Sequence, residues 1–165
     1  MSCKKLLTKV VRLFVTMGVV FACASVAVAA ELSLSEAVKA GDGDTVRSLL
    51  ADGVAVDSRE PDGTTALHWA AHQNHEEIAR LLLVSGATVD AVNRYDVTPL
   101  ALAALNGSAG MIERLLEAGA DPNRPNPEGE TPLMTAARTG NRLALTVLLE
   151  HGADVDAIEA WRGQT

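Results

Sequence analysis

The sequence has 165 residues, of which 48% are hydrophobic and 3% aromatic, and its formal net charge is −7. Residues 1–30 contain four basic residues and no acidic one, so the remainder holds ten basic against twenty-one acidic residues, a net charge of −11. Nucleic acids and anionic membranes are bound through basic patches, so this balance argues against both and favours basic partners, unless the acidity serves only solubility.

The first element is a leader over residues 1–30. A segment with four basic residues precedes an uncharged apolar run, 13–30, which ends in the small residues Ala27-Val28-Ala29-Ala30. A basic start, an apolar run and small residues at the end are typical of a secretory signal peptide. We therefore expect export to the periplasm or secretion, with no membrane insertion once the leader is removed.

Two alternatives for the leader remain open. The apolar run is of borderline spanning length, so an uncleaved membrane anchor is the first. The second is a lipoprotein signal, because Val20-Phe21-Ala22 precedes Cys23, although Phe21 is bulky for its place two residues before the cysteine. Cys3 and Cys23 both lie in this segment, so a cleaved chain has no thiol, which agrees with an oxidising compartment.

After the leader, the sequence repeats itself every thirty-three residues. Thr65-Ala66-Leu67-His68-Trp69-Ala70-Ala71 returns as Thr98-Pro99-Leu100-Ala101-Leu102-Ala103-Ala104 and as Thr131-Pro132-Leu133-Met134-Thr135-Ala136-Ala137. The same interval links the leucine pairs 49–50, 82–83, 115–116 and 148–149, and the polar series Asp57, Asp90, Asn123, Asp156. A fixed period of this length indicates a solenoid, whose units bury their apolar faces against their neighbours. The units cover about residues 32–59, 60–93, 94–126 and 127–159, and residues 160–165 start a fifth.

Each unit is predicted to form two short helices followed by an extended turn. Thr98 and Thr131 have the residue type of a helix N-cap, and a proline follows each at the first helical position. The first helix should end at Gly41, Asn74, Gly107 and Gly140, and the second at Gly53, Gly86, Gly119 and Gly152, because glycine and asparagine accept a left-handed backbone. Asp96 occupies a turn position where the flanking units have Gly63 and Gly129, which it tolerates at some conformational cost.

These motifs resemble the ankyrin repeat, with its Thr-Pro-Leu-His start, paired alanines and Leu-Leu-x-x-Gly-Ala end. The resemblance covers essentially all of residues 31–165. The second unit keeps the threonine but has Ala66 in place of the proline, and the first unit lacks the Thr-Pro start altogether, as an N-terminal cap would. It implies an all-α solenoid of helix-turn-helix units with extended β-turn or hairpin loops. It also implies a monomeric scaffold that binds another protein through its concave surface.

The last residues raise a further expectation. Arg162-Gly163-Gln164-Thr165 opens the fifth unit one residue late, and no capping helix follows it. The second helix of residues 143–150 should then leave apolar surface uncovered. We expect a fragment of a longer product, the alternative being that the exposed end contacts a partner.

The candidate binding residues lie on the exposed side of the first helices and at the turn tips. Trp69, Tyr95, Leu102 and Leu105 form what we call the apolar strip, since side chains of these kinds anchor interfaces. The alternative is that Leu102 and Leu105 only pack between units. The other candidates are polar or lie at the end of the chain: His72, Gln73, Arg94, Asn106, Arg138 and Trp161, beside Arg59, Thr135 and Thr139.

No arrangement of residues predicts catalysis or a cofactor. His68, His72 and His75 have helical spacing that suits zinc, but the resemblance implies that His68 and His75 bond local backbone. The carboxylates of Asp42 and Asp44, and those of Glu76 and Glu77, are expected on solvated surfaces. The sequence therefore predicts an exported, non-enzymatic interaction protein. The alternatives are a stabilising accessory of a periplasmic enzyme and a fragment of a larger secreted effector.

Overall fold

The computed structural model describes residues 33–158. The chain divides after Ser33, and every described helix belongs to the second unit, Leu34–Thr165. The predicted leader with Cys23, the start of the fifth repeat and Trp161 lie outside the described residues. No helix within residues 33–158 is long and apolar enough to cross a membrane.

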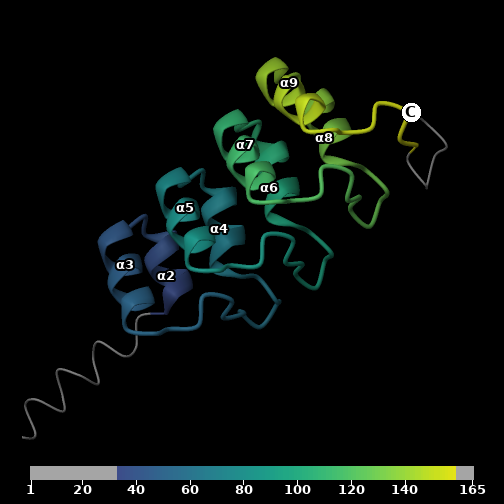
Figure 1. The fold of residues 1–165 in the computed structure, drawn as a ribbon. Helices are drawn as coiled ribbons and strands as arrows, with labels where there is room; N and C mark the ends of the chain where they lie inside the picture. Colours follow the sequence, from purple (N-terminus) through teal and green to yellow (C-terminus); the bar gives the residue numbers. More distant parts are fainter. Residues whose placement is uncertain (1–32, 159–165) are drawn as a thin grey trace, which may run out of the picture. The chain divides into compact units, whose positions relative to one another are not determined.

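The described residues form consecutive pairs of short antiparallel helices (Figure 1). The pairs are α2 (Leu34–Lys39) with α3 (Gly43–Ala51), α4 (Ala66–His72) with α5 (Glu76–Val84), α6 (Pro99–Asn106) with α7 (Ala109–Glu117), and α8 (Pro132–Thr139) with α9 (Arg142–Glu150). Within a pair, the two helices pack against each other. The predicted all-α fold of helix pairs is confirmed.

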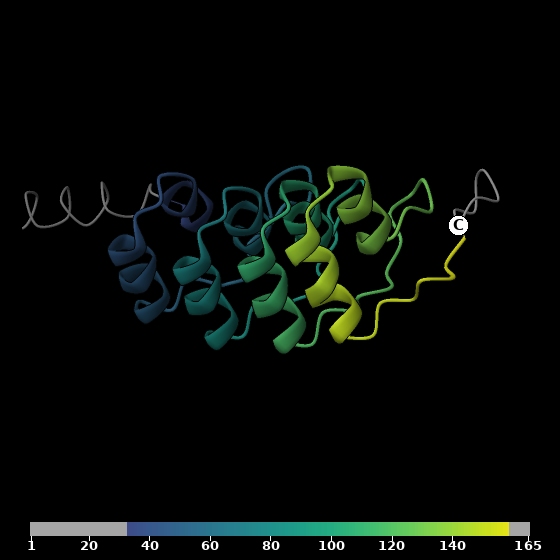
Figure 2. The same cartoon turned by 90° about the horizontal axis from the view of Figure 1, so that it is seen from above.

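The pairs stack in a row, which forms two parallel layers of helices (Figure 2). The first helices α2, α4, α6 and α8 pack each on the next, and the second helices α3, α5, α7 and α9 do the same. The core consequently runs along the stack instead of closing around one centre. This is the arrangement that the thirty-three-residue period predicts.

Small side chains make the close approach of the first helices possible. Ala70, Ala71, Ala103 and Ala104 are all 0% exposed, because the neighbouring helix lies directly against them. Most of the large buried apolar side chains come from the second helices, where Leu82, Leu115 and Leu148 are also 0% exposed. One layer therefore contributes close contact and the other contributes most of the apolar volume.

The helix ends agree with their sequence signals. The hydroxyl oxygens of Thr98 and Thr131 accept hydrogen bonds from the backbone N–H groups of Ala101 at 3.1 Å and Met134 at 3.4 Å. The first helices then end at residues with positive φ, among them Asn74 at 57° and Gly107 at 66°. These local signals are repeated in each unit, and this is why the sequence located the helices.

The polar series at the unit boundaries ties each unit to the next. The carboxylate of Asp57 accepts from the N–H of Thr88 at 3.0 Å and from its hydroxyl at 2.6 Å. One unit later, Asp90 accepts from the N–H of Asp121 at 3.2 Å. The amide oxygen of Asn123 does the same for Asp154 at 2.7 Å. Each side chain therefore satisfies a backbone donor 31 residues further along the chain.

The turn tips are hairpin-like. The N–H of Asn93 donates to the carbonyl of Val97 at 3.3 Å, and the N–H of Asn126 donates to that of Glu130 at 3.0 Å. Within each tip, the backbone turns through one residue with positive φ. In the tip of the third unit this residue is Asp96, with φ 52°. A non-glycine residue in that region is strained by sterics, as expected from the sequence.

The last described helix exposes apolar side chains. Leu143 is 70% and Leu149 45% exposed on α9, whereas Leu148 between them in the helix is buried. The expectation of apolar surface on residues 143–150 is in agreement with these values.

Candidate functional site

The predicted apolar strip is only partly free. Tyr95 is 56% and Leu105 48% exposed, but Trp69 and Leu102 are half-buried and pack against the core. Leu102 therefore contributes to packing, which the alternative to a binding role also expects, while Leu105 is about half exposed. Tyr95 and Leu105 are the members of the strip with the most area available to a partner.

Trp69 is held by two residues outside its own helix. Its indole N–H donates to Oε1 of Glu60 at 3.2 Å, and the same oxygen accepts from Nζ of Lys39 at 2.6 Å. Nζ of Lys39 also lies 4.2 Å from the centroid of the indole ring, a cation–π arrangement. Within α4, the His72 ring meets the indole edge-on, with centroids 6.1 Å apart. The orientation of Trp69 is therefore set by three neighbours before any partner arrives.

Arg138 on α8 also forms an ion pair with a glutamate, as Lys39 does on α2. Its guanidinium donates from Nε to Oε1 of Glu130 at 3.0 Å and from Nη2 to Oε2 at 3.3 Å. Lys39 and Arg138 occupy the same position of their units, and each is joined to a glutamate of a turn tip. The cations of the first helices are therefore largely neutralised within the fold.

The polar candidates differ in how free they are. Nδ2 of Asn106 donates to the carbonyl of His72 in the preceding unit at 2.5 Å, so this side chain joins two units. Gln73, at the C-terminal end of α4, is exposed. At the tip, Nη2 of Arg94 donates to the hydroxyl of Tyr95 at 2.9 Å, and its guanidinium lies 5.0 Å from the ring centroid. Arg94 and Tyr95 therefore form an exposed pair of side chains in contact with each other.

A hollow of about 200 Å³ lies where the second repeat meets the third, among the predicted residues. Its lining comes from two turn tips and two first helices: Asp62, Thr64, His68, Trp69, His72, Asn93 and Leu102. We refer to it as the hollow. The sequence indicated Trp69, His72 and Leu102 but not Asp62, Thr64 or Asn93. These three read as ordinary turn residues, and nothing in the sequence reveals which turn side chains face the helices.

His68 is a structural residue. It is 0% exposed, and its Nδ1 accepts from the backbone N–H of Thr65 at 3.2 Å. Its Nε2 lies 3.0 Å from the carbonyl of Val97, so Nε2 carries the proton and donates. Burial lowers the pKa of His68 below its usual value. The expected bond to local backbone is confirmed, and a second bond reaches the next unit.

The three histidines do not converge on a metal. Both ring nitrogens of His68 are occupied in hydrogen bonds, and His75 lies against the backbone of Gly41 in the preceding unit. Within residues 33–158, no three His, Cys, Asp or Glu side chains are placed to hold a metal ion.

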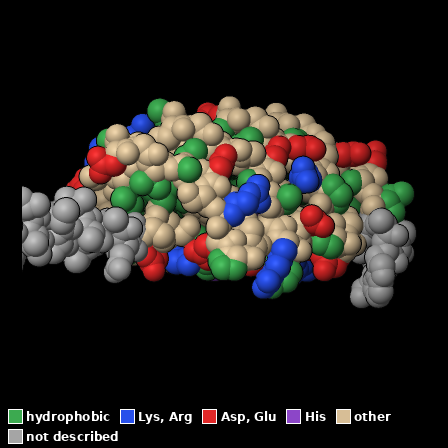
Figure 3. All heavy atoms as spheres, turned by 90° about the horizontal axis from the view of Figure 1, so that it is seen from below, with side chains coloured by type: hydrophobic (Ala, Val, Ile, Leu, Met, Phe, Trp, Pro, Cys, Tyr) green, Lys and Arg blue, Asp and Glu red, His purple; other side chains and the backbone are tan. Residues whose placement is uncertain are grey.

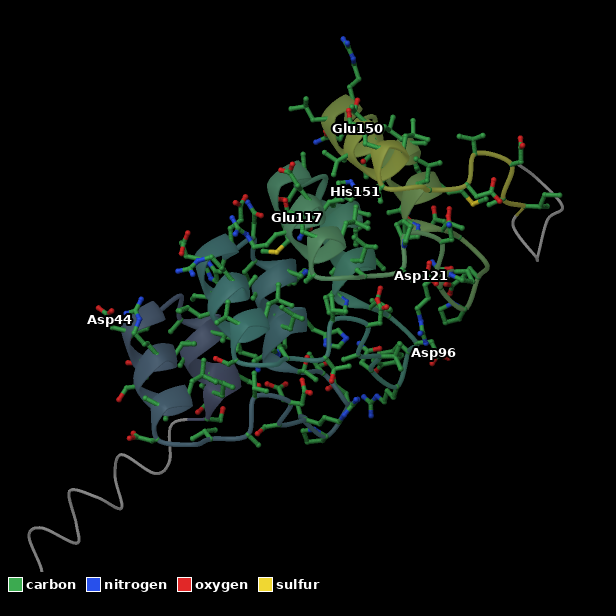
Figure 4. All side chains as sticks on the ribbon, in the orientation of Figure 1. Asp44, Asp96, Glu117, Asp121, Glu150 and His151 are labelled. Carbon is green, nitrogen blue, oxygen red and sulfur yellow. The ribbon has the colours of Figure 1, made fainter. Side chains whose placement is uncertain are left out.

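Asp42, Asp44 and Glu77 lie on solvated surfaces, whereas Glu76 is partly buried and its Oε2 lies 3.5 Å from Nη2 of Arg114 in the next unit. Asp44 forms an exposed ion pair with Nη1 of Arg47 at 2.7 Å within α3. Glu77 forms one with Nε of Arg80 at 3.0 Å within α5. Asp42 caps α3 by accepting from the N–H of Thr45 at 3.0 Å, and the hydrogen bonds from Thr45 lower the pKa of Asp42. Figure 4 shows other acidic side chains, such as Asp96 and Glu117, spread over separate elements.

Charges of both signs are mixed on the molecule. On the face seen in Figure 3, basic and acidic side chains alternate with small hydrophobic patches. No single-sign field of the kind that nucleic acids require is visible there.

The comparisons identify the repeat. A family model described as ankyrin repeats in three copies matches residues 34–126 and, in a second placement, residues 98–159. The two placements together span all four helix pairs. No curated protein matches the chain.

Proposed function

Because the chain belongs to the ankyrin repeat family, whose repeats are generally protein–protein interaction modules, we propose that it binds another protein. The binding surface is the exposed side of α4, α6 and α8 together with the turn tips. No catalytic role is part of this proposal, since the family is typically non-catalytic. The partner is received by a preformed surface, because the fold already orients the residues that would contact it.

The observation that carries this proposal is the exposure of Tyr95 and Leu105, which are close in sequence to Asn93 and Leu102 of the hollow. Large side chains that stay about half exposed are the kind that anchor a partner. Leu102 and Trp69, the other two members of the strip, are partly buried and pack against the core. A rigid base of this kind reduces the entropy lost on binding.

The test is loss of capture by a double variant, Tyr95→Ala with Leu105→Ala. Because a single anchoring side chain such as Tyr95 can contribute about 2 kcal/mol at an interface, binding should weaken about thirtyfold or more. Partners would be collected from a cell-envelope extract by affinity purification and mass spectrometry, and the affinity of each would then be measured by calorimetry with the purified partner.

The matched control is Val84→Ala with Val155→Ala, which removes two exposed side chains away from the strip, 79% and 64% exposed. It should bind as the unmodified protein does. Equal weakening of both double variants, with helical circular dichroism intact, would contradict the proposed surface.

We propose in addition that the protein is exported. The support is the order of charges and apolar residues in 1–30 and the presence of both cysteines within that segment. Determining the N-terminus of the protein from the envelope extract tests this. A start near Glu31 is expected, whereas a start at Met1 would mean an anchor and a start at an acylated Cys23 would mean a lipoprotein.

The second candidate function is that the protein stabilises a periplasmic enzyme. It uses the same proposed binding surface and the same expected leader. It predicts that the captured partner is an enzyme whose thermal inactivation is slower in the presence of this protein. A partner that is captured but not stabilised would favour the free-standing binder.

A further inference from the structure

The hollow between the second and third repeats has the volume of a side-chain pocket. Its 200 Å³ lie below the range of about 300–1,000 Å³ that small-molecule and cofactor sites occupy. A partner protein would reach it with one side chain.

The walls favour an aliphatic or planar group. Trp69 and Leu102 supply apolar surface from two successive first helices. Lys39 covers part of the indole at 4.2 Å from its centroid but does not line the hollow, so the hollow meets a part of the ring that Lys39 leaves free. The contact with Lys39 shows that this ring accepts a cation.

The rim supplies a carboxylate in a defined position. Oδ1 of Asp62 accepts from the backbone N–H of Thr64 at 2.9 Å, and hydrogen bonds from Thr64 lower the pKa of Asp62, so it is ionised at neutral pH. No basic group in the described part of the chain lies within 4.0 Å of this carboxylate. The charge of Asp62 is therefore not yet matched by an ion pair.

The charge of Arg94 contributes to the lowered pKa of Asp62, but no ion pair joins the two side chains, and Arg59 and Arg94 have other partners. Nη1 of Arg59 donates to the carbonyl of Val92 at 2.8 Å, and Arg94 packs on Tyr95. A carboxylate of the partner would be repelled by Asp62. A wholly apolar side chain would remove water from the carboxylate of Asp62 without offering it a hydrogen-bond donor in return. A cationic side chain with an aliphatic stem satisfies both the apolar walls and the carboxylate of Asp62.

We propose that the hollow binds an arginine or lysine side chain of the partner protein. The aliphatic stem packs between Trp69 and Leu102, and the cationic end meets the carboxylate of Asp62. The acidic excess of residues 31–165, with a net charge of −11, draws a basic partner segment toward this surface. This inference rests on the proposed function and names the chemistry of the partner.

The test uses small probes and needs no partner. The backbone and indole N–H signals of the purified ¹⁵N-labelled protein are followed by NMR while N-acetyl-arginine methylamide is added. N-acetyl-citrulline methylamide, the neutral isostere, is added in a parallel titration. The arginine probe should shift the Trp69 indole and the amides of Asp62 and Asn93 saturably, with an affinity at least tenfold higher than that of the citrulline probe.

The variant for this test is Asp62→Asn, which keeps an oxygen for the N–H of Thr64 but removes the charge. It should bind both probes equally weakly, whereas Asp96→Asn at the tip of the next unit should leave the preference unchanged. Thermal melting establishes that both variants are folded. Equal binding of the two probes by the unmodified protein, or an unchanged preference in Asp62→Asn, would overturn the inference.

Its failure is distinguishable from failure of the proposed function. If partner capture depends on Tyr95 and Leu105 while the arginine probe shows no preference, the protein is a binder but the hollow takes no cation. If the arginine probe binds through Asp62 and no partner is captured, the pocket inference stands without a partner surface. If both tests succeed, Asp62→Asn should also weaken capture of the partner at least tenfold.

Discussion

Replacing Leu82 by alanine should lower the free energy of unfolding by about 2–5 kcal/mol. Leu82 is 0% exposed on α5, and α5 packs on both α3 and α7, so the cavity weakens two unit boundaries at once. In a stack stabilised by neighbours, a defect at an interior unit affects the units on both sides. Urea denaturation followed by circular dichroism measures the change.

Val84→Ala is the control within the same helix. Val84 is 79% exposed, so its truncation should change the free energy of unfolding by no more than about 0.5 kcal/mol. Similar losses in the two variants would mean that α5 does not face its neighbours as described, and that the core does not run along the stack.

His68→Ala should lower the free energy of unfolding by about 2–4 kcal/mol, because a buried polar group left without a partner costs about 1–3 kcal/mol. The substitution leaves the N–H of Thr65 without the acceptor that the imidazole provides, and it removes the bond from the imidazole to the carbonyl of Val97, which keeps only the one from the N–H of Asn93. These groups lie in different units, so the loss affects both a helix start and a unit boundary. Thermal and urea unfolding of the variant measure it.

The same residue should make stability depend on pH. Burial lowers the pKa of His68 from 6.5, so below that pH the unfolded chain binds a proton that the folded protein resists. Its contribution is therefore fully present above pH 6.5 and declines as the pH falls toward the lowered pKa.

The measurement is the difference in unfolding free energy between pH 7.5 and pH 5, compared between the unmodified protein and His68→Ala. The variant should lose less stability over this interval. His72→Gln, which removes an exposed imidazole from the same helix, should keep the dependence of the unmodified protein. An identical dependence in His68→Ala would show that His68 is not the group responsible.

Much of the fold could be predicted because its signals are local and repeated. The threonine before Pro99 and the glycine at position 107 bracket α6 by rules that need only neighbouring residues. Copies of the same pattern in three units removed the ambiguity that one short helix would have. The expectation for Asp96 also came from local geometry, since its turn position requires a positive φ.

The candidate site was predicted less completely because it depends on residues far apart in sequence. Glu60 lies 21 residues from Lys39 and 9 from Trp69, and only the stacked fold brings all three together. Asn106 was assigned to the binding surface, but its amide joins two units through the carbonyl of His72. The sequence pattern places a side chain on a helix face but does not say which backbone group stands opposite.

The period, the helix pairs and the positions of their ends were determined by the sequence itself, since each follows from backbone preferences within a few residues. Only the tertiary structure decided that Leu102 is partly buried while Leu105 remains exposed, and that Asp62 and Asn93 complete a hollow with Trp69. Those outcomes depend on how closely one unit approaches the next, and that distance is set by the packing of the alanine faces along the whole stack.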